Sequence, residues 1–498
     1  MFSCFLRLTF FKSSDKINLM DIIETQMKGT VIMKKSLLGV LIAILAIGVI
    51  VGLVFAFSGK SDTDATPTTT TTTITTTTAE VNVPTPPEQT AEGLAYELNP
   101  DGESYTLMGI GDYAGVILNI PATHNGKPVT AVANEAFKFN RTIIEVYIPN
   151  AVTEMGEGAF SYCDSLEVIS IGSGLTHIPR FAFVGADVKD VVIPDTVTSV
   201  DYTAFWNCES LESIWIGKGV KKLGASYDEY EGTVTFSGFG DFSGCRSLES
   251  IMVSKNHSSF VSVDGNLYSK DKSLIVKYAP GKKDATFVLP EQVRVIDKGA
   301  FYNSFYLEEM TIPSSVKKVC NWAFQNSESL RQITFCEGVS EIERWVLSDC
   351  LSLVEIVVEE GNSNYKSVDG NLLTKDGKVF MQYTLGSKAE KFVIPEGVEK
   401  IQNASFSGAN NLLEVEIPEG VKVICSGAFE KCEKLERVSL PSTLEEIESS
   451  TFCFSYQMSN IVYNGTKDMW NGMNKNSIWD NGMSAYSIKC TDGTIISE

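Results

Sequence analysis

Apolar residues recur along most of the chain, and most neighbouring recurrences are 23 residues apart. One column is an aliphatic residue followed by proline, with members at Ile148, Ile193, Leu289, Ile312, Ile394, Ile417 and Leu440. A second column is phenylalanine, usually after alanine, with members at Phe137, Phe160, Phe183, Phe205, Phe242, Phe301, Phe324, Phe406, Phe429 and Phe452 and Leu347 in the same place. A unit this short cannot enclose its own core, so the pattern predicts a repeat solenoid whose stacked units share one core.

Each unit contains one strand-like stretch and one tight turn. In LERVSLP, apolar Leu435, Val438 and Leu440 alternate with polar residues, which is typical of a strand. Proline has no N–H to donate, so it is expected to end each strand at a common edge. GAF and the residues after it predict a tight turn with a short helical or 3₁₀ return. We therefore expect a mostly β, right-handed solenoid with a parallel sheet along one side.

Two stretches, 254–288 and 359–393, interrupt the period. They contain FVSVDGNLYSKDKSLIVKYAPG and YKSVDGNLLTKDGKVFMQYTLG, near copies that begin 105 residues apart. The Asp-Gly dipeptides at Asp264 and Asp369 are typical of hairpin turns between alternating strands. Each stretch therefore predicts a small antiparallel β-meander that projects from the solenoid. Calcium binding by the acidic turn residues is the alternative, although a full loop of ligands is missing.

The N-terminal part predicts a membrane segment. Leu37 to Phe57 contains 21 residues without a charge, which is long enough for a membrane-spanning helix. We expect a retained anchor over 34–58, with a cleaved signal as the alternative. Lysine and arginine precede this run, which places the N-terminus inside the cell and the long C-terminal part outside. Residues 1–33 are either a cytoplasmic extension or a mis-assigned start, because MKKSLLGVL from Met33 has the form of a natural beginning.

Residues 59–92 predict a disordered linker. Twelve of the sixteen residues from Thr63 to Thr78 are threonine, and three prolines follow before residue 92. Such a stretch has almost nothing to bury and stays extended and solvated. The expected role is a stalk that holds the folded part away from the membrane.

Charge and histidine content exclude several kinds of chemistry. The formal net charge of −21 and the lack of a dense basic run argue against nucleic-acid binding. The three histidines, His124, His177 and His257, lie more than 50 residues apart and have no ligand-like spacing. Carboxylates are abundant, but none form a distinct pair for glycoside hydrolysis. We therefore expect no enzyme activity, no cofactor and no metal.

The eleven cysteines follow the repeat instead of a disulfide framework. Five of them come three residues after the phenylalanine column: Cys163, Cys208, Cys245, Cys350 and Cys432. Alanine or serine takes the same place in other units, for example at Ala186, Ser304 and Ser327. This interchange predicts an inert ladder of small buried side chains, with disulfides as the alternative.

The unit IPEGVKVICSGAFEKCEKLERVSLP resembles the leucine-rich repeats of BspA-like bacterial surface proteins. The resemblance implies a repeat array over 93–463 that opens with a hairpin cap, and a C-terminal cap over 464–498. It also implies a secreted or surface-displayed protein that binds or adheres to a partner, without shared catalytic residues. The partner would be a protein or a glycan, and the chain is expected to be a monomer. A structural envelope scaffold is the alternative function, and a surface hydrolase is a remote third.

Candidate binding residues come from strand alternation and from one long loop. Between two inward-facing apolar columns, Tyr147, Trp215 and Met252 are expected to face solvent, where aromatic side chains make good anchors. The alternative interpretation is that strand positions simply favour such residues. The extended loop at 224–241 contributes Tyr227 and Tyr230 as a second candidate.

Overall fold

The computed structural model describes residues 84, 92–228, 233–236 and 242–497. The membrane segment predicted at 34–58, the extension 1–33 and nearly all of the linker lie outside these residues. Among the residues that are described, no helix combines the length and apolarity needed to cross a bilayer.

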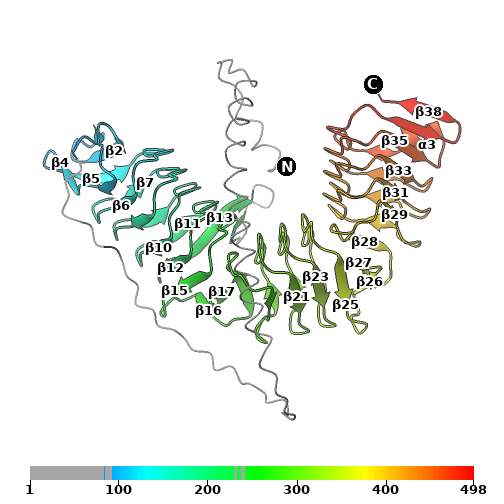
Figure 1. The fold of residues 1–498 in the computed structure, drawn as a ribbon, viewed down its shortest axis with the longest axis horizontal. Helices are drawn as coiled ribbons and strands as arrows, with labels where there is room; N and C mark the ends of the chain where they lie inside the picture. Colours follow the sequence, from blue (N-terminus) through cyan, green and yellow to red (C-terminus); the bar gives the residue numbers. More distant parts are fainter. Residues whose placement is uncertain (1–83, 85–91, 229–232, 237–241, 498) are drawn as a thin grey trace, which may run out of the picture. The chain divides into compact units, whose positions relative to one another are not determined.

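The described chain is a repeat solenoid, as the period predicts, with parallel strands on two sides of each turn (Figure 1). The longer strands of the first side form three sheets in succession. The first sheet contains β3 (Ile117–Asn119), β6 (Glu145–Tyr147), β8 (Val168–Ser170), β10 (Asp190–Ile193), β12 (Ser213–Ile216) and β15 (Ser250–Val253). The second contains β19 (Thr286–Phe287), β21 (Glu309–Ile312), β23 (Gln332–Phe335) and β25 (Glu355–Val358). The third contains β29 (Lys391–Val393), β31 (Glu414–Glu416), β33 (Arg437–Leu440), β35 (Asn460–Tyr463), β37 (Ser487–Cys490) and β38 (Gly493–Ile496).

The second side combines strands of two or three residues from the repeat units with longer strands from the N-terminal part and the two meanders. Its N-terminal sheets contain β1 (Ala95–Leu98), β2 (Tyr105–Gly109), β4 (Thr123–His124), β5 (Lys127–Val132) and β7 (Glu154–Met155), then β9 (His177–Ile178), β11 (Ser199–Asp201), β13 (Lys222–Asp228) and β14 (Thr233–Phe236). The next sheet contains β16 (Phe260–Val263), β17 (Asn266–Ser269), β18 (Leu274–Lys277), β20 (Val295–Ile296), β22 (Lys318–Val319) and β24 (Glu341–Ile342). The last contains β26 (Tyr365–Val368), β27 (Asn371–Thr374), β28 (Val379–Gln382), β30 (Lys400–Ile401), β32 (Val423–Ile424), β34 (Glu446–Ile447) and β36 (Asn474–Lys475). The sequence pattern predicts only one sheet, because strands of two residues are too short to show alternation.

The two apolar columns form the core. On β12, Ile214 and Ile216 are fully buried and Trp215 between them is partly exposed, as alternation requires. The phenylalanine rings stack from turn to turn: the centroids of Phe301 and Phe324 are 4.7 Å apart, with an angle of 11° between the ring planes. Each buried ring therefore supports the units before and after it.

The return after each strand contains turns, so the expected helical or 3₁₀ return is wrong. Around Phe324, the φ angles of Trp322 and Asn326 are 59° and 57°, which is left-handed backbone. The same two places, two residues before and two after the column residue, have positive φ at Phe181 and Gly185, Thr203 and Asn207, Trp345 and Asp349, Ala404 and Gly408, and Gly427 and Lys431. A left-handed residue interrupts right-handed helical winding, so no helical turn can form there.

The two β-meanders are confirmed, but they do not project from the solenoid. Val263 pairs with Asn266 across an antiparallel turn in which Asp264 and Gly265 both have positive φ, as a two-residue hairpin requires. The third strand, β18, then pairs in parallel with β20 of the next unit. The first meander is thus part of the second-side sheet, and the second meander joins it in the same way through β28 and β30.

Each meander separates two blocks of core. Leu267 on β17 packs into the N-terminal block, and its neighbour Tyr268 packs into the middle block. Both side chains are almost fully buried, because they face opposite sides of the same strand. Sequence alternation alone does not distinguish such a two-sided strand from one with a solvent face.

The predicted cysteine ladder is confirmed, and hydrogen bonds explain its spacing. The ten cysteines from Cys163 onward are buried thiols. The Cys350 thiol donates to the Phe324 carbonyl of the preceding unit at 3.0 Å, and Cys432 donates to Phe406 at 3.1 Å. Ser327 makes the equivalent bond to the Phe301 carbonyl at 3.0 Å. Cysteine and serine interchange here because both are small and both can donate, and alanine fills the same place at Ala186 without that hydrogen bond.

We expect Cys432→Ala to lower the free energy of unfolding of its unit by about 1 kcal/mol, because the Phe406 carbonyl loses its thiol donor. Cys432→Ser is expected to cost less, since Ser455 makes the same bond to the Phe429 carbonyl one unit later. Hydrogen exchange of the neighbouring backbone amides measures both losses. Equal losses for the two variants would contradict a hydrogen-bonding role.

The C-terminal end of the array is closed by a short helix and a strand. Trp470 of α3 (Lys467–Gly472) and Trp479 are both buried and pack edge to face against each other. Strand β38 pairs antiparallel with β37. These elements cover the last unit, whose apolar edge would otherwise meet water.

Candidate binding surfaces

The outer face of the first-side N-terminal sheet carries an apolar stripe. Trp215 on β12 is directly in register with Val192 on β10 and with Met252 on β15. All three side chains are partly exposed, whereas the alternate positions beside them are buried. Neighbouring strands lie about 4.8 Å apart, so these side chains form one continuous surface. Trp215 and Met252 therefore occupy the predicted face.

Tyr147 is the exception, and its predicted exposure is wrong. The side chain is only 7% exposed, although alternation places it on the same outer face. Its hydroxyl donates to the Glu145 carboxylate at 2.7 Å, and Asn119 and Ser170 are its partners on the neighbouring strands. Burial and the nearby carboxylate raise the pKa of Tyr147 to about 12. The ring thus belongs to the structure of the sheet and offers little surface to a partner.

Half of the loop candidate, residues 229–232 and 237–241, lies outside the described residues. The backbone of Tyr227 belongs to β13, which pairs antiparallel with β14. Tyr230 falls outside the described residues. The loop at 224–241 is therefore built around a β-ribbon, and the role of its tyrosines stays a prediction.

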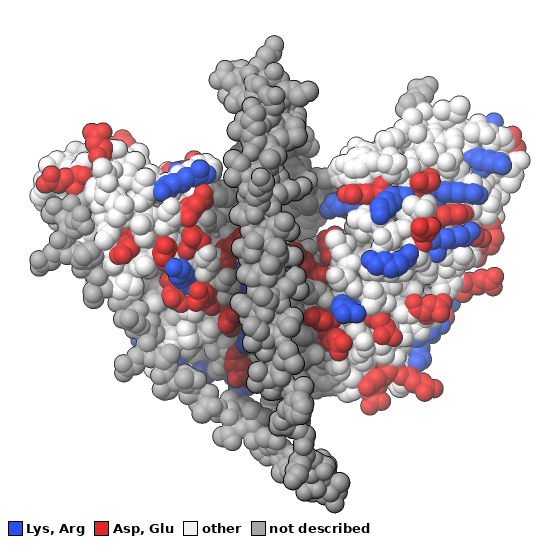
Figure 2. Space-filling view, in the orientation of Figure 1, with Lys and Arg blue, Asp and Glu red and all other residues white. Residues whose placement is uncertain are grey.

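Charged residues dominate the corresponding face of the third sheet, and they pair with one another. Lys391 contacts Glu414 at 3.5 Å and Glu416 at 3.3 Å, and Arg437 contacts Glu414 at 3.8 Å. Figure 2 shows acidic and basic side chains interspersed over the C-terminal repeats. These partners satisfy one another across the strands, which leaves the N-terminal stripe as the more apolar face.

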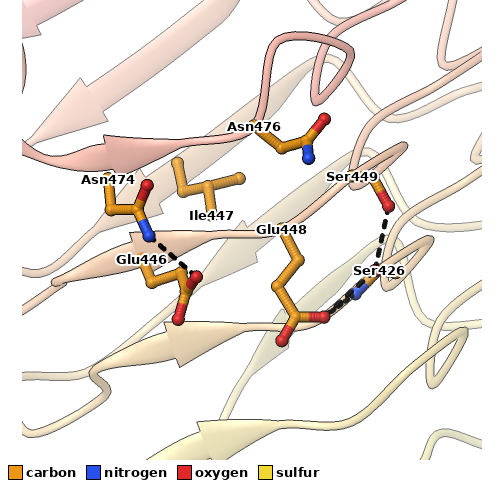
Figure 3. A pocket seen from close by; sticks show the side chains of 7 residues that line it. All are labelled: Ser426, Glu446, Ile447, Glu448, Ser449, Asn474 and Asn476. Carbon is orange, nitrogen blue, oxygen red and sulfur yellow. Dashed lines mark hydrogen bonds between the residues drawn. The ribbon is translucent and has the colours of Figure 1, made fainter.

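A polar hollow of about 290 Å³ lies on the second side near the C-terminus (Figure 3). Its two carboxylates already have partners. Glu446 accepts from the Asn474 amide at 2.9 Å, and Glu448 accepts from the Ser426 backbone N–H at 2.9 Å. Since both groups hold neighbouring units together, the hollow is best explained as part of the structure.

A second hollow, of about 380 Å³, has a mostly polar lining that includes two apolar side chains, and the sequence pattern does not predict it. Leu351 and Val354 line it and are each about half exposed, with Arg331 and Lys388 nearby. These residues lie between the repeat columns, so periodicity marks them neither as core nor as surface.

The described residues hold no group of three or more histidine, cysteine, aspartate or glutamate side chains placed to share a metal ion. His257 is buried and hydrogen-bonded to the backbone, while His177 pairs with Asp201 at 3.2 Å. The Asp201 carboxylate raises the pKa of His177. Both histidines thus have structural partners.

A repeat of this length, with parallel strands on two sides and a buried phenylalanine or leucine at the return, is typical of a leucine-rich repeat solenoid. The chain belongs to the BspA type leucine-rich repeat family, whose model matches residues 130–260, 282–370 and 380–479 in six copies. The family resemblance predicted from the sequence is therefore confirmed.

Several solved structures are similar to this chain. A leucine-rich repeat protein from Eubacterium ventriosum shares 20% identity over 81% of this chain and 98% of its own, with a TM-score of 0.47. A leucine-rich cell surface protein from Faecalibacterium prausnitzii shares 23% identity over 79% and 99%, with a TM-score of 0.37. The pneumococcal vaccine antigen PcpA shares 18% identity over 82% and 89%, with a TM-score of 0.31. Among curated proteins, none matches the chain.

Proposed function

We propose that this chain is a surface-displayed binding protein that uses the stripe of Val192, Trp215 and Met252 to hold a protein partner. The observation that carries the proposal is Trp215, a large side chain kept partly exposed between two apolar neighbours in register. Tryptophan is enriched among the residues that dominate interface energies, and an apolar centre with polar surroundings is typical of such interfaces.

Membership of the BspA type family and the uncharged N-terminal run support display at the cell surface. In this proposal the run anchors the chain, the threonine-rich linker spaces the array from the membrane, and the array lies outside the cell. The carboxylates of the described hollow serve the structure, which supports binding in preference to catalysis.

The partner is best sought by capture on the full-length chain displayed on cells, followed by affinity measurements on each captured protein. We expect Trp215→Ala combined with Met252→Ala to weaken binding at least about tenfold, because truncation of an interface anchor costs about 2 kcal/mol or more. The fold should persist, since both side chains lie outside the core.

The matched control is Thr334→Ala, which changes the equivalent position on β23 of the second sheet. It should leave affinity unchanged. Equal affinities for the wild type and the Trp215 and Met252 double variant would contradict this site and favour the 224–241 loop. A chain that is displayed intact and captures no partner would favour a structural scaffold instead.

A further inference from the structure

Three polar side chains with complementary chemistry meet on the outer face of the second side. His177 begins β9, and Ser199 and Asp201 are the two ends of β11. His177 and Ser199 are register partners on these parallel strands, and each directly precedes a fully buried residue, Ile178 or Val200. Because side chains alternate along a strand, all three polar side chains point away from the core.

The three side chains form one hydrogen-bonded series. The Ser199 hydroxyl lies 2.7 Å from Nδ1 of His177, and Nε2 of His177 lies 3.2 Å from the Asp201 carboxylate. An ionised carboxylate only accepts, so Nε2 of the neutral ring carries the proton and Nδ1 accepts from the Ser199 hydroxyl. A serine that donates to a histidine, which in turn donates to a carboxylate, is the arrangement that activates a nucleophile for acyl transfer.

The repeat explains why these residues escape a search along the sequence. His177 and Ser199 are 22 residues apart, which is one repeat unit, so the fold places them side by side. The expectation of no enzyme activity depends on the spacing between histidines. Here the relevant signal is a histidine and a serine that occupy the same column in successive units.

Charged residues flank this group on the neighbouring strands. Lys222 of β13 is in register with Ser199 on the side away from His177. It is exposed and forms no ion pair with any described residue. An ammonium group beside a nucleophile can stabilise the oxyanion that develops during acyl transfer. On the other side, Glu154 of β7 occupies the same column as His177.

The group is open to solvent. The side chains of His177 and Asp201 are 45% and 27% exposed, and the two hollows described above are lined by other residues. An open strand face admits an ester whose alcohol part is bulky or polymeric, because the substrate need not be enclosed. It offers no buried apolar contact to a long acyl chain, so the expected acyl group is short.

We propose that Ser199, His177 and Lys222 form an esterase site for acetyl and other short acyl esters, with Ser199 as the nucleophile and His177 as the base. The Ser199 oxygen bonds to the ester carbonyl carbon while Nδ1 of His177 takes the hydroxyl proton, and Lys222 faces the oxyanion. The bond to the alcohol oxygen then breaks, and the alcohol leaves with that proton. Water, which gives a proton to the same nitrogen, attacks the acyl-serine; the acid leaves and the Ser199 hydroxyl is restored.

Asp201 is a positioning residue in this scheme. It holds the ring through the Nε2 proton and stabilises the charged imidazolium, without exchanging a proton itself. The activity goes beyond the proposed binding function and shares no residue with the stripe on the first side.

The test uses the purified full-length chain with p-nitrophenyl acetate, p-nitrophenyl hexanoate and a fluorophosphonate label for activated serines. We expect acetate hydrolysis, no faster reaction with hexanoate, and label on Ser199 when the modified peptides are mapped. Ser199→Ala and His177→Gln should each lower kcat/KM at least about tenfold. Lys222→Gln should lower kcat with little change in KM, because the oxyanion exists only after attack.

The matched control is Ser426→Ala. The Ser426 hydroxyl also lies on the second side and contacts a carboxylate, that of Glu448 at 3.0 Å, but its printed partners include no histidine. This variant should hydrolyse p-nitrophenyl acetate as the wild type does, and the label should not modify Ser426 in the wild type.

Asp201→Asn adds a measurement that a purely structural role would not change. The Asp201 carboxylate raises the pKa of His177, and a base acts only when unprotonated. The rate should therefore rise with pH through that pKa, and Asp201→Asn should move the rise to lower pH and lower kcat at least about fivefold. Glu154 and Lys222, the charged residues on the flanking strands, are unchanged in this variant. An unmoved profile would contradict the role given to Asp201.

Two results would each overturn the esterase proposal: the wild type hydrolyses acetate no faster than Ser199→Ala, or the fluorophosphonate modifies other residues and not Ser199. Faster hydrolysis of hexanoate would contradict the preference for short acyl groups. Labelling is measured on the wild type, so it decides even where a variant fails to fold. The stripe of Val192, Trp215 and Met252 is intact in every variant, so failure here leaves the binding proposal untouched.

Discussion

Phe324→Ala is expected to lower the free energy of unfolding of the middle repeats by about 3–5 kcal/mol. The ring is fully buried and stacks on Phe301, the column residue of the previous unit. Truncation leaves a cavity between two units, and a turn held by left-handed residues on both sides has little freedom to collapse into it. The loss therefore falls on the interface between units as well as on the unit itself.

Because a long array need not unfold in one step, limited proteolysis and hydrogen exchange report this loss better than a single melting temperature. New cleavage is expected in the units around residue 324, with the C-terminal block less affected. The control is Phe324→Leu, since Leu347 fills the same position one unit later; an apolar swap of similar volume costs less than about 1.5 kcal/mol. An unchanged digestion pattern for Phe324→Ala would mean that the buried phenylalanine column does not stabilise the contacts between units.

The sequence predicts most of this fold because the 23-residue unit recurs many times and nearly every unit places an apolar residue in the same columns. Ile214 and Ile216 mark the buried face so clearly that Trp215 between them is correctly placed outside. The phenylalanine column predicts the stacked core for the same reason. Such inference works where one physical requirement, burial at every unit, is repeated along the chain.

The errors occur where a residue's surroundings depend on more than the period. Tyr147 obeys alternation, but the bond from its hydroxyl to Glu145 and its flanking strands leave it covered. The meanders were placed outside the solenoid because a strand buried on both faces, such as β17, resembles an alternating one.

The candidate surfaces were harder to predict than the fold, since they occur once and not in every unit. Trp215 is predicted because it is a large aromatic residue at an outward-facing position that most other units fill with a smaller side chain. The hollow beside Leu351 lies outside the apolar columns that repeat. A binding surface in a solenoid depends on residues that occur in one unit only. A periodic sequence pattern identifies the positions that every unit shares, so it does not identify such residues.

His257 gives the second large expected effect, because its ring bonds three backbone groups, one buried and two partly buried, where the first meander begins. Its Nε2 donates to the Val220 carbonyl at 2.7 Å, and its Nδ1 accepts from the N–H groups of Ser259 and Phe260, each at 3.1 Å. The side chain is 1% exposed. A buried group left without a partner costs about 1–3 kcal/mol, and the two partly buried N–H groups cost less. His257→Ala should therefore lower the local free energy of unfolding by about 2 kcal/mol or more.

The second meander supplies the matched control. Asn362, 105 residues later, donates through its side-chain amide to the Val339 carbonyl at 3.0 Å and accepts from the N–H groups of Asn364 and Tyr365 at 2.9 Å each. An asparagine thus performs the same task with the same polarity. His257→Asn is therefore expected to retain most of the stability that His257→Ala loses. Equal losses for the two variants would contradict the backbone-bonding role.

The same geometry predicts a pH dependence, since Nδ1 must stay unprotonated to accept two N–H groups. Burial lowers the pKa of His257 from its ordinary value near 6.5. The folded state then binds the proton less readily than the unfolded state, so this stability is fully present above about pH 6.5 and is lost as pH falls through the lower folded pKa. Hydrogen exchange across the first meander, measured at pH 7.5 and 5.0 and corrected for the intrinsic exchange rates, should show protection falling in the wild type. His257→Asn should remove that part of the change, because asparagine does not titrate; the same pH response in both proteins would show that another group causes it.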